Sequence, residues 1–159
     1  MKQIVNNYFE NKADKILSVK EATILDAEFI ERVFSQNRAA LHAEDISLIE
    51  WQGFLSAGDP DEKHFIVCND TTPVGYIKIN GLLNPNEVWI STLIVAKEQH
   101  RQGIGSFAIS YAEQYVKSLK FELIKIQTDS DNIPAISCYT KCGYQIYAKG
   151  SRIKFYKKL

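Results

Sequence analysis

The chain has few of the features that would place it outside the ordinary globular class. Its three cysteines, Cys68, Cys138 and Cys142, are an odd number and do not suit a disulfide framework. No apolar run approaches the roughly 20 residues of a membrane span, and Met1–Lys12 lacks the continuous apolar stretch of a signal peptide. We therefore expect a reduced, cytoplasmic protein without a membrane partner.

The sequence also lacks an excess of charge of either sign. Lys and Arg together number 19, as do Asp and Glu. This balance argues against nucleic-acid binding driven by overall charge, although a local basic pocket remains compatible with it. With 159 residues, 45% of them hydrophobic and 24% charged, the chain is expected to form one domain over residues 1–159 with a substantial core.

Hydrophobic periodicity predicts a mixed α/β fold built on one sheet. Strands are expected at residues 15–23, 64–68, 74–80, 88–95, 121–128, 144–148 and 153–157, and helices from residue 26 onward and at 45–57, 104–119 and 134–142. The strands at 64–68 and 74–80 should form an antiparallel hairpin. The unit 88–128 should be a right-handed crossover with parallel strands, and its first strand should be buried on both faces.

A glycine-containing turn, His100-Arg101-Gln102-Gly103-Ile104-Gly105-Ser106, joins that strand to the best-defined amphipathic helix. Glycines leave the backbone N–H groups of the turn uncovered, and the first turn of a helix has N–H groups without a partner inside the helix. These donors and the positive end of the helix dipole favour an anion, most often a phosphate. The turn therefore predicts a site for a phosphorylated cofactor.

Three classes of phosphorylated cofactor compete for this turn. A nucleotide-triphosphate loop requires Lys and then Ser or Thr after its second glycine, whereas Gly105 is followed by Ser106 and Phe107. A dinucleotide fingerprint accepts Ala108 as its third small residue but also requires an acid at the end of the next strand. That strand ends in Gln127-Thr128, which weakens this second interpretation without removing it.

The third interpretation is a resemblance carried by two segments. Leu93-Ile94-Val95 and then His100-Arg101-Gln102-Gly103-Ile104-Gly105 resemble the acetyl-CoA signature of the GNAT superfamily of N-acetyltransferases, which is Gln or Arg, two variable residues, Gly, a variable residue, then Gly or Ala. Asp131-Asn132-Ile133-Pro134-Ala135 and Cys138-Tyr139-Thr140-Lys141-Cys142-Gly143-Tyr144 are similar to the family's segment of Asn, Ala, Tyr and a Gly-aromatic pair. The order of elements agrees along nearly the whole chain. One departure is His100, where the family usually has Gln or Arg.

The resemblance implies acetyl-CoA as the co-substrate. In this family the strand before the turn splays from its neighbour and its backbone pairs with the pantetheine arm, while the turn holds the pyrophosphate. The cofactor-binding residues expected on this basis are Leu93, Ile94, Val95, His100, Arg101, Gln102, Gly103, Ile104, Gly105, Ser106, Asn132 and Lys141. The cysteines and histidines show no metal-ligand spacing, so no metal site is expected.

The resemblance also implies direct attack of an amine on the thioester. Tyr139 occupies the position of the family's general acid, and a phenol with a pKa of about 10 can protonate a departing thiolate. Related enzymes often place a carboxylate base on the strand before the turn, but the matching position here is Trp89. Glu87 is the only acid near that strand and is the candidate base, with Glu50 or His42 as alternatives from the helical region.

Two functions remain open from the sequence. The first is an acetyl-CoA-dependent N-acetyltransferase that acts on a primary amine of a small molecule or a peptide. The second is an acetyl-CoA-binding sensor or scaffold of the same fold with little turnover, an alternative supported by Trp89 at the position of the base. Near-zero net charge does not choose the acceptor, and the resemblance also implies pairing as a homodimer.

Overall fold

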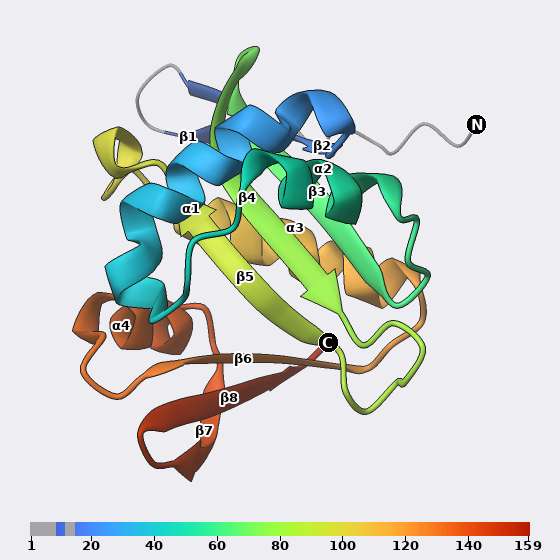
Figure 1. The fold of residues 1–159 in the computed structure, drawn as a ribbon. Helices are drawn as coiled ribbons and strands as arrows, with labels where there is room; N and C mark the ends of the chain where they lie inside the picture. Colours follow the sequence, from blue (N-terminus) through green and yellow to red (C-terminus); the bar gives the residue numbers. More distant parts are fainter. Residues whose placement is uncertain (1–8, 12–14) are drawn as a thin grey trace.

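The computed structural model describes residues 9–11 and 15–159, with side chains described from residue 16 onward. The strands are β1 (Phe9–Asn11), β2 (Lys15–Glu21), β3 (Glu62–Asn69), β4 (Thr72–Asn80), β5 (Trp89–Val95), β6 (Leu123–Asp129), β7 (Gln145–Lys149) and β8 (Arg152–Lys158). The α-helices are α1 (Ala27–Leu41), α2 (Leu48–Ser56), α3 (Ile104–Ser118) and α4 (Ile133–Lys141), with short 3-10 turns at Ile24–Asp26 and Lys97–Gln99. The strands form one sheet in the order β1-β2-β3-β4-β5-β6-β8-β7 (Figure 1).

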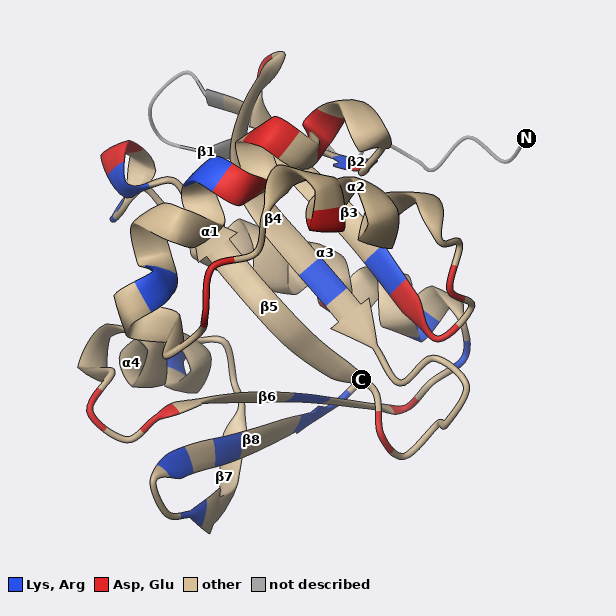
Figure 2. Cartoon of the chain, in the orientation of Figure 1, with Lys and Arg blue, Asp and Glu red and all other residues tan. Residues whose placement is uncertain are grey.

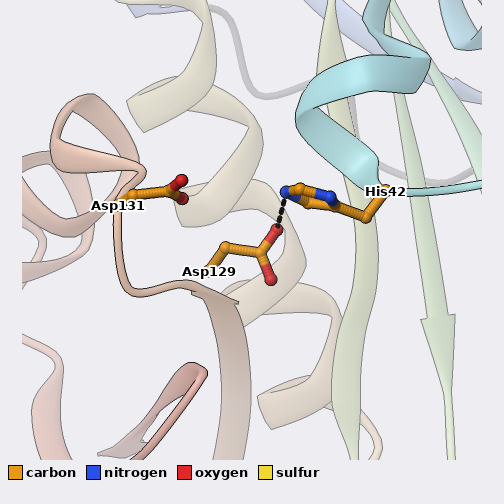
Figure 3. A group of neighbouring side chains, drawn as sticks. All are labelled: His42, Asp129 and Asp131. Atoms are coloured by element: carbon orange, nitrogen blue, oxygen red, sulfur yellow. Dashed lines mark ion pairs between the residues drawn. The ribbon is translucent and has the colours of Figure 1, made fainter.

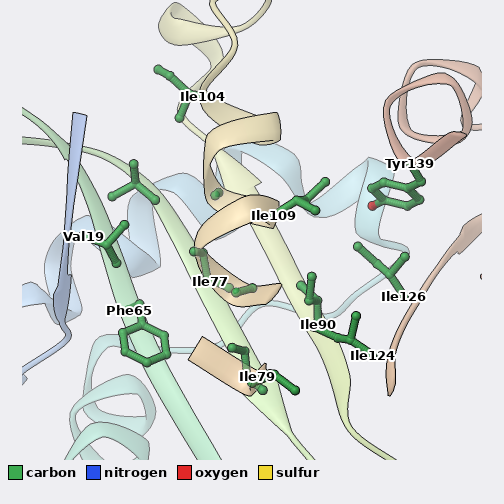
Figure 4. Packing of buried hydrophobic residues seen from close by; sticks show 14 of the residues in the cluster. Val19, Phe65, Ile77, Ile79, Ile90, Ile104, Ile109, Ile124, Ile126 and Tyr139 are labelled. Atoms are coloured by element: carbon green, nitrogen blue, oxygen red, sulfur yellow. The ribbon is translucent and has the colours of Figure 1, made fainter. Parts of the chain in front are cut away.

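Helices cover the sheet on both faces and create two apolar cores. α1 and α2 lie on one face, called here the α1/α2 face, where Ile30, Trp51 and Tyr76 belong to one buried cluster. α3 lies on the opposite face, the α3 face (Figure 1), and its buried residues join those of the sheet in the larger cluster. Figure 4 shows part of that cluster, including Ile109 of α3 and Tyr139 of α4. Among the described residues, no helix combines the length and apolar character that crossing a membrane requires.

The predicted mixed α/β fold and its order of elements are confirmed, with one strand added. β1 pairs antiparallel with β2 and is not predicted by the sequence, while the rest of Met1–Lys12 lies outside the described residues. α2 begins later than predicted because Ser47 caps it: the Ser47 hydroxyl accepts from the Glu50 N–H, and the Glu50 carboxylate accepts from the Ser47 N–H. β3 and β4 form the predicted antiparallel hairpin, and β5 and β6 are parallel as predicted.

The prediction that residues 88–95 form a strand buried on both faces is wrong for most of that strand. Within β5 only Ile90 and Ile94 are fully buried. β5 pairs with β6 through two Cα partners alone, Trp89 with Lys125 and Ile90 with Ile126. Beyond that point β5 has a paired strand only on its β4 side, because the two parallel strands diverge.

A β-bulge bends β5 where the divergence begins. Ser91 has no partner opposite it in β4, although its neighbours Ile90 and Thr92 are both paired there. A bulge increases the local twist and bends the strand that carries it, so it helps β5 turn away from β6. The Ser91 hydroxyl also donates a hydrogen bond to the Lys78 carbonyl of β4 at 3.3 Å. The backbone edge of Leu93–Val95 that faces β6 is therefore left without a neighbouring strand.

Candidate active site

The glycine turn between β5 and α3 presents a series of free backbone donors. Arg101 (φ 61°) and Gly103 (φ 80°) both adopt the left-handed conformation, which glycine adopts without steric cost. No N–H group from Arg101 to Ser106 donates to an atom of the described residues, and the first helical bond joins the Phe107 N–H to the Gly103 carbonyl. Successive N–H groups in such a turn form a concave anion site at the positive end of the helix dipole.

One further observation at this turn fits a phosphate-bearing ligand. A Cβ built on Gly105 meets no atom within 4 Å, so open space lies beside the donors. The Oε1 of Gln102 is buried without a hydrogen-bond partner among the described residues. His100, the departure from the family pattern, holds its Nε2 2.8 Å from the Val95 carbonyl. This contact fastens the turn to the end of β5.

Tyr139 lies on α4 and packs its ring edge-on against Phe155 of β8, with a centroid distance of 5.5 Å. The residue is only 8% exposed, yet no hydrogen bond joins its hydroxyl to the described residues. Burial raises the pKa of Tyr139, and the neighbouring thiols of Cys138 and Cys142 raise it further. The phenol therefore stays protonated at neutral pH, as a proton donor must. Both thiols are free, and Cys138 Sγ lies 3.8 Å from the Ser106 hydroxyl of the turn.

The two residues predicted to reach the far side of the cofactor differ in their surroundings. Asn132 is the N-cap of α4, and its Oδ1 accepts a hydrogen bond from the Ala135 N–H at 3.2 Å. Its amide NH2 group is the part left for a ligand. Lys141 lies in the last turn of α4 and is exposed. The cap also orients the start of the helix that carries Tyr139.

Glu87 immediately precedes β5, at the end where β5 and β6 are still paired. One carboxylate oxygen accepts from Trp89 Nε1 and the other lies near Lys125 Nζ, each at 3.1 Å. These hydrogen bonds, that of Trp89 first, lower the pKa of the Glu87 carboxyl. Both oxygens are thus engaged at the closed end of the splay, which is unfavourable for a base that must serve the open end.

The α1/α2 face contains a polar network that sequence reasoning missed. His64 of β3 holds its Nδ1 2.7 Å from the Tyr76 hydroxyl of β4 and its Nε2 3.0 Å from a Glu62 oxygen. The other Glu62 oxygen lies 2.7 Å from Lys78 Nζ of β4. The sequence shows only an alternation of polar residues along two strands. These residues form a network because the strand register places His64 opposite Lys78. These four residues are called the Glu62 network below.

A second group joins the end of α1 to the end of β6. His42 Nε2 lies 3.1 Å from Asp129 Oδ2, and Asp131 is close by (Figure 3). One ligand atom from each of these three residues lies within 4.8 Å of the others, an arrangement that could hold a metal ion. The guanidinium of Arg152 competes for this position, because its Nε lies 3.3 Å from the other Asp129 oxygen. The spacing of the histidines in the sequence does not predict this grouping.

A model of the acetyltransferase (GNAT) family matches residues 24–144, which include β5, the glycine turn, the Glu62 network and Tyr139. The chain belongs to the acetyltransferase (GNAT) family, and the resemblance inferred from the two sequence segments is confirmed. Streptothricin acetyltransferase from Escherichia coli is 26% identical over 95 residues, which are 58% of this chain and 54% of that protein. The chain thus spans about half the length of that relative.

Solved structures share the fold over nearly the whole chain. The PaiA N-acetyltransferase of Thermoplasma acidophilum, in complex with coenzyme A, has a TM-score of 0.75 and 19% identity, over 90% of this chain and 99% of that one. Spermidine N-acetyltransferase from Vibrio cholerae, in complex with CoA and spermine, has a TM-score of 0.79 and 18% identity, over 89% of this chain and 95% of that one. These structural similarities establish the fold, but they do not identify the acceptor.

Proposed function

We propose that this protein transfers the acetyl group of acetyl-CoA to a primary amine. The observation that carries the proposal is the continuous path from the unpaired edge of Leu93–Val95 to the free N–H donors of Arg101–Ser106. An extended ligand arm can pair with a free strand edge as an added strand would, and a diphosphate suits the donors at a helix N-terminus. Acetyl-CoA has both parts, and its thioester would supply an activated acetyl group.

The residues of the chain divide the binding work among them. The backbone of Leu93, Ile94 and Val95 would hold the pantetheine arm, and residues 101–106 would hold the pyrophosphate. His100 would support the turn through the Val95 carbonyl, while the buried Oε1 of Gln102 has an acceptor position to offer. Asn132 through its amide and Lys141 through its charge would reach the far side of the cofactor.

Three requirements of the reaction fall to protein groups. Tyr139 would donate its proton to the sulfur that leaves, since its phenol is buried, protonated and free of other partners. The N–H of Ile94 or Val95 would polarise the carbonyl that is attacked. A base must take a proton from the amine, which is an ammonium ion at neutral pH. Glu87 is the candidate from the sequence, although both of its oxygens are engaged.

The direct test measures thiol release from acetyl-CoA over a panel of amines that includes spermidine, spermine, streptothricin, lysine and a peptide N-terminus. In Tyr139→Phe we expect kcat to fall by about 10²- to 10⁴-fold, the usual contribution of a general acid, with acetyl-CoA affinity nearly unchanged. Tyr144→Phe is the matched control, because Tyr144 is also a buried tyrosine and its ring centroid lies 6.4 Å from that of Tyr139. Equal kcat in Tyr139→Phe and the wild type would remove Tyr139 from the mechanism.

The same panel decides between the two functions left open by the sequence. Turnover with any amine supports the acetyltransferase, and the spermine and streptothricin arms test whether acceptors named for the similar proteins are also used here. Tight acetyl-CoA binding without turnover on the whole panel would favour the sensor or scaffold. In that case Tyr139→Phe would leave every measured property unchanged.

A further inference from the structure

We propose that Cys138 is a site of reversible modification by small disulfides, and that a group attached there closes the glycine turn to acetyl-CoA. The acetyl transfer described above makes no use of this thiol. The first half of the proposal concerns the thiol alone. The second half rests on the proposed function, because it concerns the cofactor held at the turn.

Cys138 lies at the edge of the predicted phosphate site. Its sulfur, on α4, is 3.8 Å from the Ser106 hydroxyl in the first turn of α3, and Ser106 also has one of the free N–H groups of the glycine turn. Cys138 is half-buried and Ser106 is exposed, so a small reagent can reach the sulfur from solvent. A group attached to Cys138 therefore begins next to the donors that would hold the pyrophosphate.

The neighbouring thiol of Cys142 makes Cys138 the more acidic of the pair. Cys142 lies about one helical turn further along α4, and its S–H donates a hydrogen bond to the Cys138 sulfur. This hydrogen bond, and then the Ser106 hydroxyl and the positive charge of Lys141, hold the pKa of the Cys138 thiol below its ordinary value against the opposing effect of burial. The thiolate is the form that attacks a disulfide, so Cys138 is the reactive sulfur of the pair.

The charges around the pair favour the same assignment. Lys141 is the only charged residue of α4 (Figure 2), so no carboxylate of this helix opposes a thiolate at Cys138. The pKa of Cys142 is raised first by the hydrogen bond that it donates to Cys138, and further by burial and by the charge of Glu113 of α3. Lys157 of β8 is bonded to Glu113 and to the Cys142 carbonyl. Cys142 is also the C-cap of α4, where the negative end of the helix dipole disfavours an anion, so it keeps its proton.

The third cysteine provides a comparison within the same chain. Cys68 lies on β3 and is 6% exposed, and burial raises its pKa. A buried thiol that stays protonated is inert toward disulfides. The three cysteines should therefore react at different rates, with Cys138 first.

The spacing along the helix limits the product to a mixed disulfide. Side chains four residues apart on a helix have Cβ atoms about 5–6 Å apart, whereas a disulfide requires about 3.5–4.5 Å. The Cys142 N–H donates to the Cys138 carbonyl at 3.0 Å, so the helical spacing holds between these two residues. A bond between their sulfurs would require the last turn of α4 to unwind. Cys142 is thus a hydrogen-bond donor to the reactive sulfur and does not displace the attached group.

The exchange reaction conserves atoms and electrons. With glutathione disulfide as the reagent, the Cys138 thiolate attacks one sulfur, an S–S bond forms between the two, and the S–S bond of the reagent breaks. The electron pair leaves on the second sulfur as glutathione thiolate, which takes up the proton that Cys138 released. The sum is one mixed disulfide and one free glutathione, and an added dithiol reverses the reaction.

The attached group and acetyl-CoA should exclude one another. A glutathionyl group has carboxylates, which the free N–H donors of Arg101–Ser106 attract as they would attract a pyrophosphate. A Cβ built on Gly105 meets no atom within 4 Å, so the space beside the donors is open to the attached group. A cofactor that fills the same space would in turn cover the approach to the Cys138 sulfur.

The first test treats the protein with glutathione disulfide in the absence of cofactor and follows the intact mass and the modified peptide. We expect one glutathionyl group per chain, attached to Cys138. Cys138→Ser should be modified at least about 10-fold more slowly, whereas Cys68→Ala, the matched control, should keep the wild-type rate. Modification chiefly at Cys142 or Cys68, or a loss of two hydrogen atoms through a bond between Cys138 and Cys142, would overturn the assignment.

A second test examines the contribution of Cys142 through the pH dependence of the rate. Cys142→Ala removes the S–H that donates to Cys138, so at pH 6 it should slow the modification by about 10-fold, because less of the sulfur is ionised. At pH 9 the order should reverse, because both sulfurs are then ionised and the thiolate with the lower pKa is the weaker nucleophile. Lys141, Glu113 and Lys157 cancel, since both proteins contain them. Equal rates at pH 6 would remove Cys142 from the site.

A third test examines the closure of the turn. Acetyl-CoA, which has no free thiol, should slow the modification by up to about 100-fold when present at about 100 times its Kd. Protein modified at Cys138 should bind acetyl-CoA at least about 10-fold more weakly in calorimetric titration, with full recovery after dithiothreitol. Unchanged affinity after complete modification would overturn the closure of the turn. If the unmodified protein binds no acetyl-CoA, the proposed function fails, whereas the first test still decides whether Cys138 is a modification site.

Discussion

At the scale of single residues, Gly81 shows how little room the loop before β5 leaves. Its φ is +81°, and a Cβ at this position would lie 1.8 Å from the Glu87 carbonyl oxygen. We predict that Gly81→Ala destabilises the protein by at least about 2 kcal/mol, because both the left-handed backbone and the clash must be relieved. Urea denaturation measures this change.

Gly53 is the matched control for that substitution, since it lies inside α2 and a Cβ there meets no atom within 4 Å. Gly53→Ala should stabilise the protein by about 0.5–1 kcal/mol, because alanine loses less backbone entropy in a helix. Opposite signs for the two variants are expected. A destabilisation of Gly81→Ala below that of an average surface substitution would mean that the loop can open at little cost.

At the scale of elements, one substitution at the N-terminus of α3 should change folding stability and ligand affinity in opposite directions. We predict that Gly105→Glu raises the free energy of unfolding by roughly 1 kcal/mol, since glutamate is a better helix former than glycine and favours the positive end of the dipole. The same substitution should weaken acetyl-CoA binding by more than about 100-fold, because its charge and bulk enter the space beside the free donors. Calorimetric titration and denaturation measure the two effects.

The opposite end of α3 provides the control. Lys117→Glu places the same charge in the last turn, next to the negative end of the dipole, so it should lower stability by a few tenths of a kcal/mol and leave acetyl-CoA affinity unchanged. Gly103→Glu is less informative, because the left-handed φ of Gly103 would add strain to any loss of binding. Normal acetyl-CoA affinity in Gly105→Glu would show that the phosphate site lies elsewhere.

The sequence predicts the helices and strands well because they depend on local patterns. The helical spacing of α3 and the glycine turn before it are visible in one short segment, and the predicted role of Tyr139 rests on a second. The burial of β5 is predicted wrongly because it depends on a strand whose paired residues lie 36 positions further along the chain. A run of apolar residues cannot show that β6 pairs with two positions of β5 and then leaves it.

At the scale of the whole molecule, tertiary register creates the parts of the site that no motif contains. His64 and Tyr76 are 12 residues apart and hydrogen-bonded, and His42 meets Asp129 across most of the chain. Neither pairing follows from residue type or spacing. The candidate bases named from the sequence were Glu87, Glu50 and His42, whereas the polar contacts of the Glu62 network appear only once the strand register is known.

The burial of His64 also predicts how global stability depends on pH. The pKa of His64 is lowered by burial, so below its ordinary value of about 6.5 the unfolded chain binds a proton that the folded protein does not. The free energy of unfolding should therefore fall as the pH drops from 7.5 to 5, by at most about 1.4 kcal/mol per pH unit from this one group. Glu62 does not affect this result, because its pKa is lowered and the stability that it contributes is lost only below its ordinary pKa of 4.5.

Urea denaturation at several pH values should show a shallower fall in His64→Gln than in the wild type, and His42 and His100 cancel because both proteins contain them. Parallel curves would mean that the buried imidazole accepts a proton as readily as an exposed one.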